Sequence, residues 1–208
     1  MNEAAWKDAM LHQVPTANAA VDIKMYRNAT LGAFKDALDT TNAIVAYIDH
    51  GAIIASPMAS GLCFTGNNCL MDRALTNIGG IQYENPTGWH WFPQDSIAPK
   101  AKVVFLGACG ITKDFISFWN LQPGHVLIVP DYNPTGNPKI NPTMEIFENE
   151  VAWEWAQIAS NLAAGNTVDV AVKAAKDFAD LHQVPPNSWK WKVIPTGGGN
   201  VKFPPPSR

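Results

Sequence analysis

Short apolar runs separated by amphipathic segments dominate the chain. Three of them, AIVAYI at 43–48, KVVFLGA at 102–108 and VLIVP at 126–130, are too short to form helices of their own. Runs of this kind are typical of strands that are buried on both faces of a parallel sheet. We therefore expect three buried strands in one sheet, with 43–48 in a central position.

In the segments between these runs, apolar residues recur at the three- or four-residue intervals of a helix. Thr30 is suited to cap a helix that runs to about Asp39, with Leu31, Phe34 and Leu38 on one face. A short helix within 114–120 is expected to cross between the second and third strands.

Two further helices are expected near the C-terminus. The Asn-Pro pair at 141–142 starts a long helix that ends near Gly165, and Thr167 opens another. The apolar stripe of the last helix is expected to consist of Val168, Ala171, Ala175 and Phe178. Weaker signals predict a helix at 3–12, an edge strand at 21–27, a hairpin at 61–72, irregular excursions at 79–99 and 130–142, and a last strand or two within 189–203.

Strands that alternate with helices predict an α/β fold, in which a mostly parallel sheet carries helices on both faces. We expect one domain over residues 1–203 and a flexible tail at 204–208. Ligands of such sheets bind at the carboxyl ends of the strands. The functional residues are therefore expected at that edge.

Composition narrows the classes of function. Hydrophobic residues make up 47% of the 208 residues and charged residues 16%, which favours a folded core over disorder. The net charge is −3 with scattered Lys and Arg, so we expect no nucleic-acid partner. We also expect no cofactor, because the glycine-rich 195–200 segment has no helix after it, and no membrane partner, because no stretch reaches about 18 apolar residues. A cytoplasmic location is the expectation.

The cysteines leave their redox state open. Cys63 and Cys69 flank a predicted hairpin turn and are able to bond in an oxidising compartment, although no export signal favours one. A zinc site that combines this pair with His90 has weak support, because the spacing does not match structural zinc sites. His12, His125 and His182 lack other ligands at suitable spacing, and we expect no metal.

A histidine and a cysteine each follow a predicted strand. His50 precedes Gly51 after the first run, and Cys109 follows the second run. If these strands are adjacent and parallel, the thiol and imidazole meet at one edge, as nucleophilic thiol catalysis requires. The amides of Gly51 and Cys109 are then candidate donors to an oxyanion. A cysteine at the end of an apolar strand is more often structural, and only the joint pattern favours catalysis.

The segments YIDHGA and VVFLGACG resemble the signatures of the caspase-like (clan CD) cysteine peptidases, and within them the CHAT domains related to separase. LAAGNTVDVAVKAAKDF is similar to a late helix of that family, and the resemblance covers about 21–203. It implies a caspase-like sandwich, His50 as the catalytic histidine, Cys109 as the nucleophile, and the Gly51 and Cys109 amides as oxyanion donors. The implied partner is a peptide or protein substrate, with any regulator a separate chain.

Asp131 is the candidate for specificity. In separase-like relatives an acidic residue after the strand that follows the cysteine strand lines the pocket for the side chain before the cleaved bond, and VLIVPDYNPTG places Asp131 there. A carboxylate in that position favours Arg or Lys. The alternative is that Asp131 only forms a turn.

A second class of function stays open. Family domains begin with an additional strand and helix, for which the residues before the 21–27 strand leave little room, and the chain carries eight Trp. These features also suit a catalytically inactive caspase-like module that acts in protein assembly, including a homo-oligomer.

Overall fold

The computed structural model of the protein describes the strands and helices that surround the predicted site. The described residues are 28–41, 43–49, 51–55, 58–65, 68–71, 89–91, 97–108, 111–131, 144–181 and 191–203. The predicted helix at 3–12, the predicted strand at 21–27 and the tail at 204–208 lie outside these residues, as do His50 and Cys109.

Four strands form the main sheet of the described part, in the order β1 (Ile44–Ile48), β6 (Val103–Gly107), β7 (Val126–Pro130) and β8 (Trp191–Ile194). β1, β6 and β7 run parallel, and β8 is antiparallel to β7. The prediction of an α/β fold with a mostly parallel sheet is therefore confirmed for this part of the chain.

β6 and β7 are buried along their whole length, as the apolar runs predict. β1 differs, because it stands at the end of the described strand order and its burial alternates. Val45 and Tyr47 are buried on one face, whereas Ile44, Ala46 and Ile48 are half-buried on the other. The expectation of a central strand buried on both faces is thus not met among the described strands.

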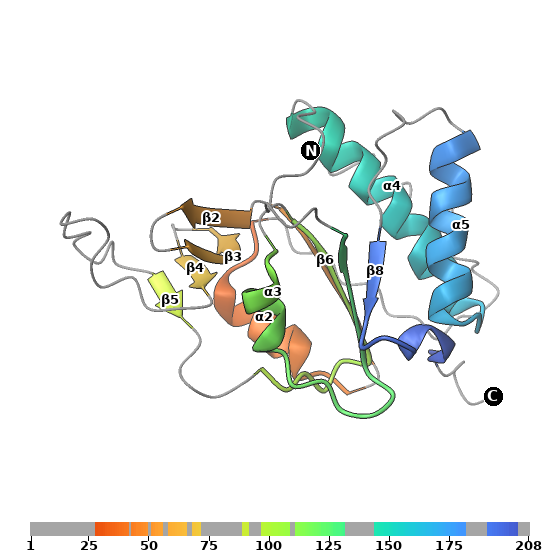
Figure 1. Cartoon of the computed structure of the whole chain (residues 1–208), viewed down its shortest axis with the longest axis horizontal. Coiled ribbons are helices and arrows are strands. Elements are labelled where there is room, and N and C mark those ends of the chain that lie inside the picture. The colour runs from red at the N-terminus through yellow and green to blue at the C-terminus, as the bar shows by residue number, and fades with distance from the viewer. Residues whose placement is uncertain are drawn as a thin grey trace.

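Side chains alternate between two cores, one on each face of the main sheet. Helices α4 (Met144–Ala163) and α5 (Val168–Leu181) lie on one side of the sheet in Figure 1 and share the first core. The strand residues in this core are Val103, Phe105, Val126 and Ile128, and those in the second core include Val104, Leu106, Leu127 and Val129.

None of the described helices is long and apolar enough to cross a membrane.

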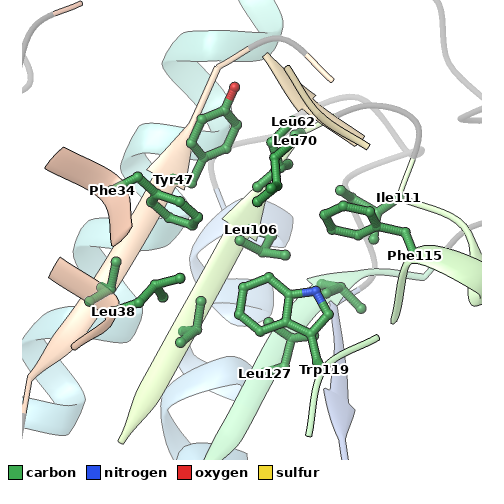
Figure 2. Close-up of a cluster of buried hydrophobic side chains, with 14 of the residues drawn as sticks. Phe34, Leu38, Tyr47, Leu62, Leu70, Leu106, Ile111, Phe115, Trp119 and Leu127 are labelled. Carbon is green, nitrogen blue, oxygen red and sulfur yellow. The ribbon is translucent and has the colours of Figure 1, made fainter. Parts of the chain in front are cut away.

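The second core is covered by α2 (Leu31–Leu38), α3 (Lys113–Ser117) and a small sheet. The Thr30 hydroxyl accepts a hydrogen bond from the Ala33 amide at 3.2 Å, which confirms Thr30 as the cap of α2. Thr112 caps α3 in the same way. Figure 2 shows the side chains that fill this core: Phe34, Leu38, Tyr47, Leu62, Leu70, Leu106, Ile111, Phe115, Trp119 and Leu127.

The small sheet has the order β2 (Gly51–Ala55), β3 (Met58–Phe64), β4 (Asn68–Met71) and β5 (Trp89–Trp91). The β3–β4 pair is the hairpin predicted from the sequence, and Cys63 stands opposite Cys69 in its register. β2 was not predicted, although it pairs with β3 along its whole length.

The C-terminal elements largely follow the sequence prediction. α4, α5 and β8 occupy the expected segments, and Gly165 has a positive φ of 82° just after α4. One member of the predicted α5 stripe is wrong: Ala179 is buried in place of Phe178, which is half-buried. The physical reason is lateral packing, because Phe178 stacks on Trp153 of α4 instead of pointing into the core.

Cys63 takes part in a disulfide, which answers the redox question that the sequence left open. Its position opposite Cys69 in the β3–β4 register makes Cys69 the expected partner, because directly opposed residues bring their Cβ atoms close together. The bond leaves Cys63 without a thiolate for zinc, which removes the alternative with His90.

We expect reduction of this bond to lower the free energy of unfolding by about 2 kcal/mol, because the loop that it closes is short. Denaturant unfolding with and without dithiothreitol measures the change, and Cys63→Ala should show the same loss and no response to the reductant. Mass spectrometry of a non-reduced digest should give a peptide that links Cys63 to Cys69. A peptide that links Cys63 to Cys109 would contradict both the expected pairing and a free thiol at Cys109.

Gly107 allows α4 to approach the end of β6. A Cβ atom at Gly107 would lie 2.5 Å from Val151 Cγ1, 3.0 Å from Phe105 Cε1 and 3.3 Å from Ile48 Cγ1. These distances are shorter than ordinary packing contacts. The missing side chain therefore brings α4, β1 and β6 together two residues before Cys109.

Gly107→Ala should destabilise the protein by about 1–3 kcal/mol through overpacking, as measured by denaturant unfolding. Gly32→Ala is the matched control: Gly32 is exposed in α2, and the nearest atom to an added Cβ is Thr30 Oγ1 at 3.8 Å. That change should raise stability by up to about 1 kcal/mol, because alanine favours helix. Equal effects of the two variants would contradict the close packing at Gly107.

Candidate active site

The carboxyl ends of β1 and β6 lie side by side at one edge of the main sheet. In their parallel register, Ile48 is paired with Gly107. His50 and Cys109 each follow their paired residue by two positions. The condition set by the sequence, that the two strands be adjacent and parallel, is therefore met. The contact between His50 and Cys109 itself stays a prediction, because both residues lie outside the described part.

Chain length restricts how far apart these two residues can be. Neighbouring strands are about 5 Å apart, and two residues of extended chain span at most about 7 Å. If strand spacing continues for two more residues, the thiol and the imidazole come within reach of each other. The described register therefore permits a catalytic dyad at this edge without a long loop.

β1 of the main sheet and β2 of the small sheet are close in the sequence. β1 ends at Ile48 and β2 begins at Gly51, so Asp49 and His50 are the two residues between these strands. Gly51 is half-buried and stands opposite Leu62 in the β2–β3 pair. The predicted oxyanion donor at Gly51 thus starts a paired strand, which holds the backbone on the C-terminal side of His50.

Tyr47 anchors the end of β1 to the small sheet. Its hydroxyl donates a hydrogen bond to the carbonyl oxygen of Cys63, and its ring packs against Phe34 and Phe64. Burial, with the negative charge of Asp49, raises the pKa of Tyr47 well above its ordinary value. The phenol therefore stays a proton donor and cannot act as a general base at neutral pH.

Two exposed carboxylates stand on either side of the cysteine strand. Asp49 directly follows β1, and Asp131 directly follows β7, the two strands that flank β6. Asp131 thus lies at the carboxyl end of a strand next to that of Cys109, as the sequence predicts. Whether its side chain faces Cys109 stays a prediction. Continued by strand geometry, the registers place Asp49 and Asp131 both level with Ala108, one residue before Cys109.

A buried carboxylate that sequence reasoning missed lies near the same edge. Glu154 of α4 is only 2% exposed, and its Oε2 accepts a hydrogen bond from Trp191 Nε1 at 2.5 Å. Trp191 stands opposite Pro130 in the β7–β8 register, beside Asp131. A glutamate within the apolar stretch VAWEWAQIA was the available signal. Its bond fixes α4 to the start of β8, because a buried acceptor needs its donor.

The described part of the chain shows no second candidate site built from histidines or from metal-binding side chains. His125 Nδ1 lies 3.1 Å from the carbonyl oxygen of Pro99, at the amino end of β7, so His125 is a hydrogen-bonded structural residue. Within the ranges that the structure describes, no group of three His, Cys, Asp or Glu side chains is arranged to hold a metal ion.

Comparison with known proteins does not identify a function for this protein. No protein-family model matches the chain, and no curated protein matches it at a significant level. The resemblance to caspase-like peptidases is therefore a hypothesis that depends on the two strand-end motifs and on the strand arrangement described above.

Proposed function

We propose that this protein is a caspase-like cysteine endopeptidase in which Cys109 is the nucleophile and His50 the general acid and base. The observation that carries the proposal is the parallel β1–β6 register, in which each of the two residues follows a matched position by the same number of residues. Two rigid strands are a suitable support for a dyad, because catalytic groups need to be held in place.

The proposed reaction proceeds by acyl transfer. The Cys109 thiolate attacks the carbonyl carbon of the scissile peptide bond, and the amides of Gly51 and Cys109 stabilise the oxyanion that forms. Collapse breaks the C–N bond, and the His50 imidazolium gives its proton to the leaving amine. Water then attacks the thioester while His50 takes its proton, which releases the acid and the free thiol.

We further propose that the enzyme cleaves after Arg or Lys, with Asp131 paired to the substrate cation. Its position at the carboxyl end of β7, the strand beside the one that precedes Cys109, supports a preference for a cation. The substrate is a peptide or protein segment, and the proposed chemistry uses no cofactor.

The cellular compartment stays a separate proposal. The sequence favours the cytoplasm, whereas the Cys63 disulfide favours an oxidising environment, since cytosolic thiols are usually kept reduced. Alkylation of free thiols in intact cells, followed by mass spectrometry of Cys63, distinguishes the two: an alkylated Cys63 indicates a reducing compartment.

Cys109→Ala and His50→Ala should each lower kcat/KM on a peptide library by about a thousandfold or more, and the double variant should lose little beyond either one, because the two residues act as a unit. His125→Ala is the matched control, since His125 lies at the amino end of β7, and it should retain the activity. Iodoacetamide should label Cys109 in the native protein and abolish cleavage.

The inactive assembly module is the alternative function, and the same experiment separates it from the peptidase. Full retention of cleavage in Cys109→Ala, or a native protein without cleavage and without labelling of Cys109, would contradict the peptidase. Circular dichroism spectra that match those of the unchanged protein are needed to show that each variant folds.

Asp131→Asn should reduce cleavage after Arg by about 10–100-fold, because a charge-assisted hydrogen bond is lost, and should leave cleavage after uncharged residues largely unchanged. The matched control is Asp39→Asn, since Asp39 pairs with Lys100 at 3.4 Å before β1 and β6 begin, at the opposite edge of the sheet. A preference for Arg that survives in Asp131→Asn would show that Asp131 only forms a turn.

A further inference from the structure

The large hydrophobic side chains exposed within the described residues all belong to the α4–α5 helix pair. They are Trp153 at 41%, Val170 at 48% and Leu181 at 78% exposure. Exposed apolar side chains that gather on one pair of elements mark a contact surface more often than scattered ones do. These three residues belong to the helix layer and not to the strand ends that form the candidate active site.

On α5 these side chains form a continuous stripe. Val170, Ala174, Phe178 and Leu181 follow one another at intervals of three or four residues, so they share one side of the helix. Ala174 and Phe178 are half-buried, and the neighbouring side of α5 packs into the core through Val168, Ala171, Ala175 and Ala179. The apolar face of α5 is therefore wider than the side that packs into the core.

Trp153 extends the stripe onto α4. Its ring stacks on that of Phe178, with the ring centroids 6.1 Å apart and an angle of 19° between the planes. Figure 1 shows the two helices side by side on one side of the main sheet. We call the surface formed by Trp153, Val170, Ala174, Phe178 and Leu181 the α4–α5 patch.

Charges beside the patch alternate in a self-complementary order. Lys173 lies 2.5 Å from Asp177, and Lys176 lies 2.5 Å from Asp180, both as exposed pairs within α5. In each pair the lysine is nearer the N-terminus of the helix and the aspartate nearer the C-terminus. Two copies of α5 that pack antiparallel therefore bring lysines of one copy beside aspartates of the other.

We propose that the α4–α5 patch is the contact surface of a symmetric homodimer, in which α5 packs antiparallel to α5 of a second copy. A two-fold axis near residues 175 and 176 places Val170 opposite Leu181 of the second copy. The same axis places the small Ala174 opposite the large Phe178 and Lys173 opposite Asp177.

The midpoints of the three pairs fall within one residue of each other, at 175.5, 176 and 175, so one two-fold axis brings all three pairs close together. A stripe whose large side chains all lay at one end would not be complementary to a second copy of itself. The same holds for a flank that carried charges of only one sign. The pairing of a small with a large side chain also lets the helices approach closely. The proposal does not depend on the peptidase activity, because no residue of the patch belongs to the proposed catalytic or substrate-binding site.

Light scattering after size exclusion, and sedimentation velocity over a range of concentrations, should show a dimer of the full chain. Lys173→Asp makes the charged flank acidic, and Asp177→Lys makes it basic. Each variant alone should weaken the dimer at least tenfold, because like charges then face each other. Mixing the two variants should restore a dimer, now between unlike chains, because the flanks are complementary again.

Lys35→Asp on α2 is the matched control for a change of charge outside the patch and should leave the dimer unchanged. Leu181→Lys provides a second test that does not endanger folding, since Leu181 is largely exposed, and it should also weaken the dimer. Thermal unfolding checks that the variants fold. A monomer at all concentrations, or a dimer that neither the charge changes nor Leu181→Lys weaken, would overturn the proposal.

Discussion

The parallel pairing of β6 with β1 is the constraint on which the rest of the structure depends. β6 is buried along its whole length and contributes alternate side chains to both cores, so the helices on the two faces pack against the same strand. A shift of the register by one residue would move Val104 and Leu106 to the α4–α5 core and Phe105 to the other, where the shapes do not match. The register that satisfies both cores also fixes which residues of β1 and β6 end together.

Tyr47 is one residue that joins the small sheet to this pairing. Tyr47 belongs to β1, yet its hydroxyl donates a hydrogen bond to the carbonyl oxygen of Cys63, and its ring packs against Phe34 of α2 and Phe64 of β3. The disulfide of Cys63 restrains the same strand. The short connection of Asp49 and His50 is consequently held from both ends, by β1 and by β2.

Local signals in the sequence predicted most of the described elements. The features that could not be predicted depend on contacts between residues that are distant in the sequence. The Thr30 cap and the runs that became β6 and β7 are recognisable from a few neighbouring residues. Phe178 was assigned to the core because spacing gives a helical face but not the width of that face, which depends on Trp153 of another helix. Glu154 was missed for the same reason, since its donor Trp191 is distant in the chain. For the site, the sequence predicted which two strands carry His50 and Cys109, and the structure adds that these strands are parallel neighbours.

His50 and Cys109 each follow the paired residues Ile48 and Gly107 by two positions, and this equal spacing bears on the orientation of the proposed dyad. Side chains alternate between the two faces of a strand. If strand geometry continues, a side chain two residues beyond Ile48 or Gly107 therefore lies on the same face of the sheet as that residue. A difference of one residue between the two connections would send the thiol and the imidazole to opposite faces. Gly107 adds to this restriction, because α4 packs closely at that position and opposes displacement of the strand end. The equal length of the two connections is therefore compatible with a dyad at this edge.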